Sequence, residues 1–260
     1  YEIASCLVGS EMCIRDRVYI PLEEVSRLES LPGEGPEWCA VLPRVWRDRD
    51  EPALRTLLER ARALGFTGVL IGNLGHLPLV RGLNFHLYGD YGLNVFNSRS
   101  LAYLKDKELE SACVSFELRF AQIRDLKKVL RAEAIVYGRL PLMITENCLV
   151  QNETGCRLDR QGPCVPEDGP CRCGQPNVLV DRTGAAFPLL PAYGHRTEIQ
   201  NSKPLYLADR PEHRRLGLAY ARLRFTTETA EECVSVVQNY LDAAPAAGDF
   251  TRGLYERGVE

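Results

Sequence analysis

The stretch Glu51–Gly72, EPALRTLLERARALGFTGVLIG, decides the fold class of this 260-residue chain. Leucine and alanine recur at helical spacing over residues 51–64, which predicts an amphipathic helix with Asp50 as its N-cap and Gly65 just past its end. The apolar run Gly68–Gly72 that follows is too short for a helix and predicts a buried strand. Together they make up half of the repeating unit of a parallel α/β sheet.

The same alternation extends in both directions from this stretch. Strands near residues 40, 69, 87, 115, 135 and 143, most of them separated by helical patterns, indicate repeated βα units. Because a complete β/α barrel needs eight such strands, we expect a partial barrel of this type, its C-terminal half, over residues 18–145. The strands are predicted at 38–45, 68–72, 84–90, 113–117, 134–137 and 142–145.

Composition narrows the class of protein. The formal net charge is -3, so the chain lacks the strong positive charge typical of nucleic-acid-binding domains. No run of 18 apolar residues is present, and we therefore expect no membrane span and a cytoplasmic protein. The pattern carries no prediction of the oligomeric state.

The remaining segments differ in character from the predicted barrel. Residues 1–17 show neither strand nor helix periodicity and resemble a translated non-native leader, so we leave them out of the fold prediction. Residues 146–210 contain the thiol-rich segment and a predicted β-hairpin over Val178–Leu190 that turns at Asp181–Gly184. Residues 211–260 form a C-terminal segment whose helix, Thr229–Leu241, is expected to place Val234, Val237 and Leu241 inward.

Polar side chains collect just after the ends of the predicted strands. Barrel enzymes build their active sites from these βα loops, so the polar residues there are candidates for chemistry, although Asn and Asp also cap the helices that follow. Two carboxylates at a barrel mouth are able to activate water. The candidate catalytic residues are Asp90, Glu117 and Tyr137, and the candidate substrate-binding residues are Asn94, Asn97 and Arg139.

Five of the ten cysteines crowd into 26 positions, with the spacing Cys148-x7-Cys156-x7-Cys164-x6-Cys171-x-Cys173. In the absence of a secretory signal, such density favours metal over disulfides. Thiolates suit both zinc and iron–sulfur clusters, and the spacing matches neither a paired zinc knuckle nor the ferredoxin pattern. The predicted metal ligands are Cys148, Cys156, Cys171, Cys173 and His195.

Several segments resemble peptidase family U32, the collagenase-like peptidases. Glu133–Gly138 (EAIVYG), followed by Pro141–Met143 and Cys148, is similar to the signature of that family, and the similarity spans about residues 38–260. The cysteine that the signature carries shortly after its glycine is replaced here, since Leu140–Thr145 has none. Further similar stretches are Gly89–Ser98, Val180–Gly184 with Phe187 and Pro188, Asn201–Tyr206 and Phe250–Gly253.

This resemblance implies a β/α barrel and two classes of activity. One is proteolysis; the other is iron–sulfur-dependent hydroxylation of RNA or of a small aromatic precursor, with a 4Fe–4S cluster on four cysteines. Cys148, Cys156 and Cys173 fit the order of the first three family cysteines, and His195 stands nearest to the place of the fourth.

The residues alone show no protease motif, because neither a GxSxG elbow nor an HExxH helix is present. The expected substrate is a peptide, an RNA or a small molecule. A non-catalytic binding domain with structural zinc is the third hypothesis.

Overall fold

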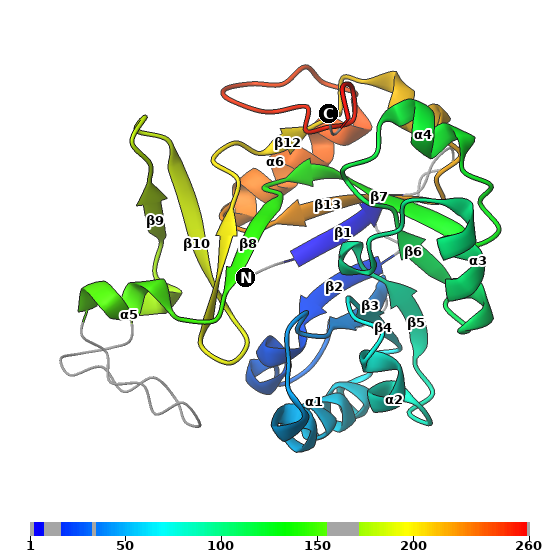
Figure 1. The fold of residues 1–260 in the computed structure, drawn as a ribbon, viewed down its shortest axis with the longest axis vertical. Coiled ribbons are helices and arrows are strands. Elements are labelled where there is room, and N and C mark those ends of the chain that lie inside the picture. Colours follow the sequence, from blue (N-terminus) through cyan, green and yellow to red (C-terminus); the bar gives the residue numbers. More distant parts are fainter. Residues whose placement is uncertain (1–2, 8–16, 33–34, 155–171, 259–260) are drawn as a thin grey trace. The chain divides into compact units, whose positions relative to one another are not determined.

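The computed structural model describes residues 3–7, 17–32, 35–154 and 172–258. The chain divides into two compact units (Figure 1). Unit 1 comprises Tyr1–Gly138 and Leu205–Glu260, and unit 2 comprises Arg139–Pro204. Within the described ranges, no helix combines the length and the apolar character that crossing a membrane requires.

The sheet of unit 1 closes on itself. Its strands follow the order β12-β7-β13-β1-β2-β3-β4-β5-β6, and an additional pairing of β6 with β7 completes a ring of eight strands from which β12 branches. The strands are β1 (Ile3–Leu7), β2 (Arg17–Pro21), β3 (Glu37–Val41), β4 (Gly68–Ile71), β5 (His86–Gly89), β6 (Ser111–Cys113), β7 (Arg131–Gly138), β12 (Leu205–Tyr206) and β13 (Tyr220–Phe225).

Seven strands of the ring run parallel, from β2 to β7 and on to β13. The eighth, β1, is antiparallel to both of its neighbours, β13 and β2. The prediction of a mixed α/β fold with a curled parallel sheet is confirmed. The described residues nevertheless form a closed ring, in which β1, β2 and β13 stand beside the five predicted strands β3 to β7.

Helices surround this ring on its outer side (Figure 1). The longest, α1 (Glu51–Leu64), begins and ends as predicted, buries Leu54, Leu58 and Ala61, and is followed by Gly65 at a φ of 99°. Asp50 does not cap it as expected, because its carboxylate accepts a hydrogen bond from the Arg47 amide instead. The other helices of unit 1 are α2 (His76–Val80), α3 (Ser98–Asp106), α4 (Phe120–Asp125) and α6 (Ala230–Leu241), with the 3-10 helices η1 (Leu22–Arg27), η2 (Asp48–Asp50), η3 (Tyr91–Leu93) and η5 (Pro211–Arg215).

The inward face predicted for the last helix is wrong for Val234 and Leu241, whereas Val237 is half-buried. In α6, Val234 is 71% exposed and Leu241 is 42% exposed, whereas Tyr240 is buried. The Tyr240 hydroxyl anchors the helix, since it accepts a hydrogen bond from the Leu207 amide and donates one to the Val136 carbonyl of β7. A single large aromatic side chain with a satisfied hydroxyl therefore takes the role that we assigned to three aliphatic ones.

Unit 2 is built on a four-stranded antiparallel sheet in the order β8-β11-β10-β9. Strands β9 and β10 pair around the turn at Asp181–Gly184, where Gly184 has a φ of 84°. The elements of this unit are β8 (Pro141–Thr145), α5 (Leu149–Thr154), η4 (Arg172–Gly174), β9 (Asn177–Val180), β10 (Ala186–Ala192) and β11 (Arg196–Gln200).

These units differ from the predicted domain boundaries. Strand β8, expected as a sixth barrel strand, pairs with β11 in unit 2. Residues 205–260 return to unit 1, where β12 and β13 both pair with β7. One further strand lies in residues 1–17, the predicted non-native leader: β1 pairs with β2 and β13, and the origin of that segment stays a prediction.

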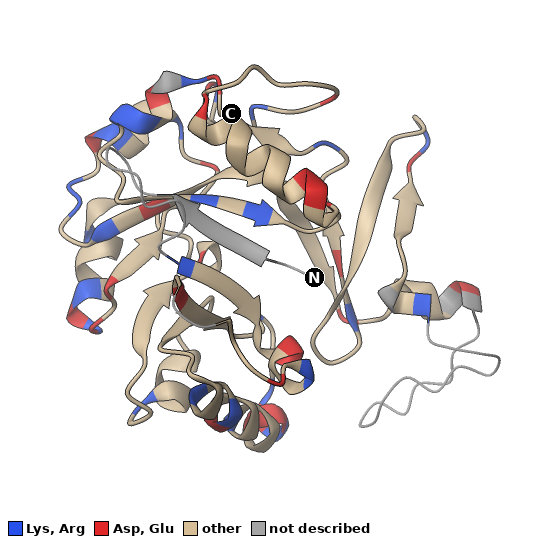
Figure 2. Cartoon of the chain, turned by 180° about the vertical axis from the view of Figure 1, so that it is seen from behind, with Lys and Arg blue, Asp and Glu red and all other residues tan. Residues whose placement is uncertain are grey.

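The interior of the ring is more polar than is usual for such barrels, which are filled mainly by branched aliphatic side chains. An apolar cluster of Tyr19, Cys39, Leu70, Tyr88 and Tyr220 shares the interior with buried charged residues. Figure 2 shows charged segments on the strands as well as on the outer helices. Charges buried in this way need partners, and their partners define the candidate site.

Candidate functional site

A buried ion-pair group lies inside the ring and reaches the carboxyl end of β5. The Arg222 guanidinium of β13 donates from Nε to the Glu133 carboxylate of β7 and from Nη1 to Asp90, at 2.5 Å. Asp90 directly follows β5, where its amide donates to the Ile71 carbonyl. All three side chains are at least nine-tenths buried. One cation thus connects two acids from strands that are far apart in sequence.

The group continues toward the amino ends of the strands. The Tyr19 hydroxyl donates to Glu133 Oε2 at 2.9 Å, and Arg17 Nη1 donates to Tyr19 at 3.0 Å and to Ser111 at 3.3 Å. Arg17 Nε then donates to Glu37 at 3.1 Å. A continuous chain of polar contacts therefore crosses the interior of the ring, and the loss of one member leaves its partners buried without compensation.

Electrostatics hold Arg222 in its charged form. Burial works against the Arg222 cation, but the neighbouring Glu133 and Asp90 carboxylates outweigh it and hold the Arg222 pKa well above its usual value. Burial also raises the pKa of the neighbouring Cys113 thiol, which is fully buried and therefore stays protonated. Arg222 Nη2 is buried, and no hydrogen-bond partner for it exists among the residues that the structure describes. We conclude that Arg222 has one unused donor beside Asp90, whereas Cys113 is not a nucleophile.

His76 lies near this group at the start of α2. Its ring is completely buried, with Nε2 3.1 Å from the Pro43 carbonyl oxygen. Burial lowers the His76 pKa to about 4, although the Pro43 carbonyl and the Asp90 charge act in the opposite direction. The ring is therefore neutral at physiological pH and hydrogen-bonds to Pro43 as an Nε2–H donor.

This pKa makes stability depend on pH. The unfolded chain protonates His76 near its usual value of 6.5, and the folded chain does so only near 4, so the folded state loses stability as the pH falls from about 6.5 to about 4. We expect a loss of roughly 3 kcal/mol over that range from this residue. Urea unfolding of the parent and of His76→Gln, which retains a donor, measures it. If the free energy of unfolding of His76→Gln depended on pH as strongly as that of the parent, His76 would not be the group responsible. His213, whose pKa burial also lowers, contributes in the same direction.

The other candidates at the carboxyl ends of the strands lie in different environments. Glu117 follows β6 in an exposed turn, where its amide donates to Ser115 Oγ. Asn94 is exposed and adopts a left-handed conformation with φ 50°. Asn97 caps α3, because its side-chain oxygen accepts from the amides of Arg99 and Ser100, both at 3.0 Å. For Asn97 the capping role is confirmed, and its role toward a substrate stays a prediction.

Tyr137 and Arg139 already have protein partners. The Tyr137 hydroxyl donates to Glu228 at 3.1 Å, and its ring packs edge-on against Tyr206 and Tyr240. Arg139, in unit 2, donates to the carbonyls of Asn201 and Ser202. The Tyr137 and Arg139 side chains therefore already make structural contacts. Of the two predicted catalytic acids of unit 1, Asp90 belongs to the buried group and Glu117 is exposed.

Two of the five clustered thiols lie in the described part of unit 2. Cys148, 6% exposed, precedes α5, and Cys173 lies in η4, which contacts α5. The Cys148 thiol makes no hydrogen bond within the described residues. His195 lies in the turn between β10 and β11, two residues before Thr197, whose hydroxyl accepts from the Leu149 amide at 3.0 Å.

The predicted thiolate metal site is described only in part. Helix α5, which directly follows Cys148, contacts η4, which contains Cys173. Cys156, Cys164 and Cys171 lie outside the described residues. Among the described residues no complete group of three or more ligands occurs, so the full ligand set stays a prediction.

The ion pairs of Arg222 with Glu133 and Asp90 form the centre of the buried group, and of these three residues Arg222 and Glu133 were not predicted as site residues. Each is a charge in a largely apolar strand: Arg222 in YARLRF (Tyr220–Phe225), which also contains Arg224, and Glu133 in RAEAIVYG (Arg131–Gly138), which begins with Arg131. Charged side chains are rarely fully buried unless they are paired, so a charge within or beside an apolar run was the available signal, although Glu133 lies just before the strand predicted at 134–137 and no strand was predicted over Tyr220–Phe225. Nothing in the local pattern identifies the partner, because Glu133 and Arg222 lie 89 positions apart.

Fold and site together define a mixed α/β barrel protein with a charge-paired interior and a separate antiparallel unit that carries thiols. The model of one family, described as peptidase family U32, matches residues 30–177, which is more than half of the chain. The chain therefore belongs to peptidase family U32.

The chain was also compared with solved structures and with curated proteins. The chain is similar to the solved structure of the U32 peptidase Mk0906, with 12% sequence identity and a TM-score of 0.36 over 48% of this chain. That match spans 61% of the length of the solved chain. None of the curated proteins matches this sequence.

Proposed function

We propose that this chain is part of a metal-dependent enzyme of family U32, with a 4Fe–4S cluster on the thiols of unit 2. The observation that carries this proposal is the buried Cys148 thiol, which lacks a hydrogen bond within the described residues and precedes a helix that contacts the Cys173 turn. A buried cysteine is often a small apolar residue, but metal ligation is what usually explains a cluster of thiols. Cys148, Cys156, Cys171, Cys173 and His195 would supply the ligands, and the cluster would provide electron transfer or bind a substrate oxygen.

On this proposal the barrel binds the substrate at the carboxyl ends of its strands. Asp90, fixed by Arg222, presents a charged oxygen of fixed orientation. Glu117 presents an exposed carboxylate, which is able to exchange protons with a substrate or with water. Asn94, Asn97 and Tyr137 are the proposed neighbours of the substrate in unit 1, and Arg139 stays a substrate-binding candidate of unit 2. The substrate is a peptide, an RNA or a small aromatic precursor, and hydroxylation of the latter two is the reaction class that the thiol cluster favours over proteolysis.

The metal content tests this proposal directly. We expect protein purified without oxygen to contain iron and sulfide in a cluster stoichiometry and to absorb broadly near 400 nm, roughly where thiolate-to-iron charge transfer occurs. Cys148→Ala should lose most of the iron and the absorption band, because one buried ligand is removed. Cys233→Ala, a half-buried thiol on α6 of unit 1, is the matched control and should keep both. Colourless protein with one zinc would instead support the third hypothesis, a binding domain with structural zinc.

Proteolysis is the second candidate, and the exposed Glu117 carboxylate favours it. Water activated by this carboxylate is the available route, because His76, His86 and His213 of unit 1 contact backbone carbonyls or a carboxylate rather than a serine or cysteine.

We expect Glu117→Gln to reduce gelatin cleavage at least about 100-fold if this carboxylate is the general base, since such groups contribute roughly 10²–10⁴-fold. Asp106→Asn, another exposed acid in unit 1, is the control that should leave cleavage unchanged. Equal cleavage by the parent and Glu117→Gln would rule out this mechanism.

A further inference from the structure

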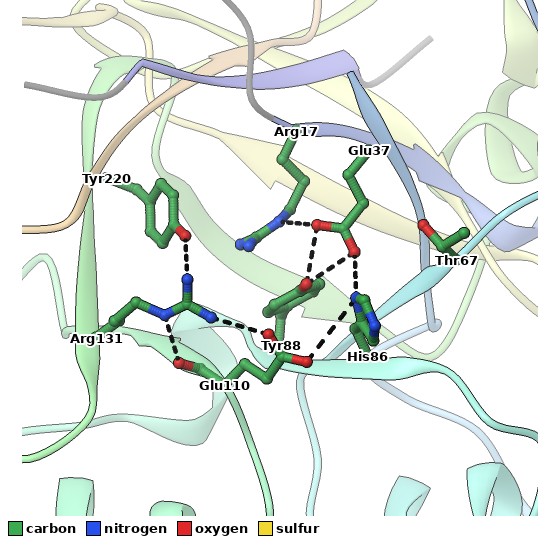
Figure 3. Close-up of a pocket in the computed structure, with 8 residues that line it drawn as sticks. All are labelled: Arg17, Glu37, Thr67, His86, Tyr88, Glu110, Arg131 and Tyr220. Carbon is green, nitrogen blue, oxygen red and sulfur yellow. Dashed lines mark hydrogen bonds and ion pairs between the residues drawn. The ribbon is translucent and has the colours of Figure 1, made fainter. Parts of the chain in front are cut away.

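A second cavity of about 420 Å³ opens at the amino ends of the parallel strands of unit 1 (Figure 3). Its lining includes the first residues of β3, β5, β7 and β13, namely Glu37, His86, Arg131 and Tyr220. Because parallel strands all start on the same side, this cavity lies at the end of the ring opposite to Asp90. Barrel enzymes bind substrates at the other end, so the proposed function does not account for it.

The floor of this cavity is a seat for one guanidinium group, which Arg17 occupies. Its guanidinium carbon lies 3.4 Å from the ring centroid of Tyr88 and 4.7 Å from that of Tyr220. Arg17 Nε donates to the Glu37 carboxylate at 3.1 Å. Aromatic faces and a carboxylate around a single cation are the features with which proteins recognise guanidinium and ammonium groups.

The hydroxyls of Tyr19 and Ser111 complete the seat by accepting from Arg17 Nη1. All of these walls come from β2, β3, β5, β6 and β13, and none lies in residues 1–17, the predicted leader. The seat is therefore a property of the barrel and independent of which cation fills it.

Charge balance also demands a cation at this position. The connected interior group contains the carboxylates of Glu37, Glu133 and Asp90, with Arg222 as the cation at its other end. Without Arg17, Arg222 would be the one arginine in the contacts named above between these three buried or half-buried acids, with His86 beside Glu37 at 2.9 Å. A negative excess in a low-dielectric interior attracts a positive ligand strongly.

We infer that the amino-end cavity is a receptor for a guanidinium group, with Arg17 as its occupant in this chain. When Arg17 is absent from it, the ligand class that fits is an arginine side chain of a peptide or a small guanidinium compound. At the mouth, the exposed pair of Arg131 and Glu110, 2.8 Å apart, and the 57% exposed His86 leave room for the rest of such a ligand. The receptor depends neither on the metal nor on the substrate of the proposed enzyme.

Chemical rescue tests this inference. Arg17→Ala should be less stable than the parent and should bind methylguanidinium, measured by calorimetry and by urea unfolding. With a dissociation constant of about 1 mM, 10 mM methylguanidinium would raise the folding equilibrium constant of the variant about 11-fold. The parent should not respond, because its seat is filled. Urea, which is similar in shape but neutral, and NaCl at 10 mM should not rescue the variant.

Two further variants keep the test decisive. Glu37→Gln added to Arg17→Ala should abolish the rescue, whereas Glu24→Gln, an acid on η1 paired with Arg27, should not. Arg17→Met fills the seat without charge and should not respond. If Arg17→Ala does not fold alone, circular dichroism should show folding on addition of methylguanidinium.

The inference is overturned if methylguanidinium acts no better than urea or NaCl, or if Arg17→Met responds as strongly as Arg17→Ala. Agmatine and the peptide Gly-Arg-Gly separate the two sources of the ligand. A stronger response to the peptide assigns the seat to a side chain, and a stronger response to agmatine assigns it to a small molecule.

Discussion

Arg222→Met is expected to destabilise the protein by about 3–5 kcal/mol, because it removes the one cation between two buried acids. Glu133 is 1% exposed and Asp90 is 7% exposed, so water cannot replace the lost partner without opening the ring. Asp90 would lose this cation, and Glu133 would lose the nearer of two cations while keeping the Tyr19 hydroxyl and Arg17 at 3.9 Å, so the buried negative charge is less well compensated. Urea unfolding at neutral pH, followed by circular dichroism, measures the loss.

A control variant separates this effect from the removal of any arginine. Arg27→Met breaks a surface ion pair with Glu24 in which the arginine is 68% exposed, and it should cost no more than about 1 kcal/mol. Neutralising both acids should recover part of the loss, so the triple variant Arg222→Met, Glu133→Gln, Asp90→Asn should be more stable than Arg222→Met alone. If Arg222→Met and Arg27→Met were equally stable, the buried group would not contribute as described.

Gly138→Ala is expected to cost about 3 kcal/mol or more, because two independent penalties coincide. Gly138 ends β7 with a φ of 113°, a conformation that side chains rarely adopt. A Cβ atom there would lie 1.9 Å from the backbone carbonyl oxygen of Arg224 in β13, so β7 and β13 would have to separate. Thermal and urea unfolding of the variant measure the cost, and a failure to fold would agree with it.

Gly184→Ala is the matched control for the backbone term alone. Gly184 also has a positive φ, of 84°, but an added Cβ would meet no atom within 4 Å. This variant should therefore lose only about 1–2 kcal/mol from the unfavourable conformation. Similar losses for the two glycines would show that the approach of β13 to β7 is looser than described.

These two predictions concern the same strand pair, and that pair also explains the site. β13 lies parallel to β7, with an irregularity in register between Arg222 and Leu223. The close passage at Gly138 lets β13 place Arg222 against Glu133. An enzyme that acts at Asp90 would depend on this contact, because Arg222 fixes the Asp90 carboxylate just after the carboxyl end of β5.

The sequence by itself determined the local elements of this protein and its family. Helix α1 begins and ends where the apolar period and Gly65 predict, and the strand after it lies within Gly68–Gly72. Asn97 is the helix cap that its residue type suggests. These features depend on contacts within a few residues, which a sequence pattern records directly.

Only the tertiary structure decided how the ring closes and what fills it. β13 lies about 90 residues after the strand that it joins, and β1 pairs with it in the opposite direction. Whether Arg222 is a surface charge or the centre of a buried group depends on Glu133 and Asp90, which lie 89 and 132 positions away. Local periodicity carries no information about such partners, because the free energy of a buried charge is set by the groups that surround it in space.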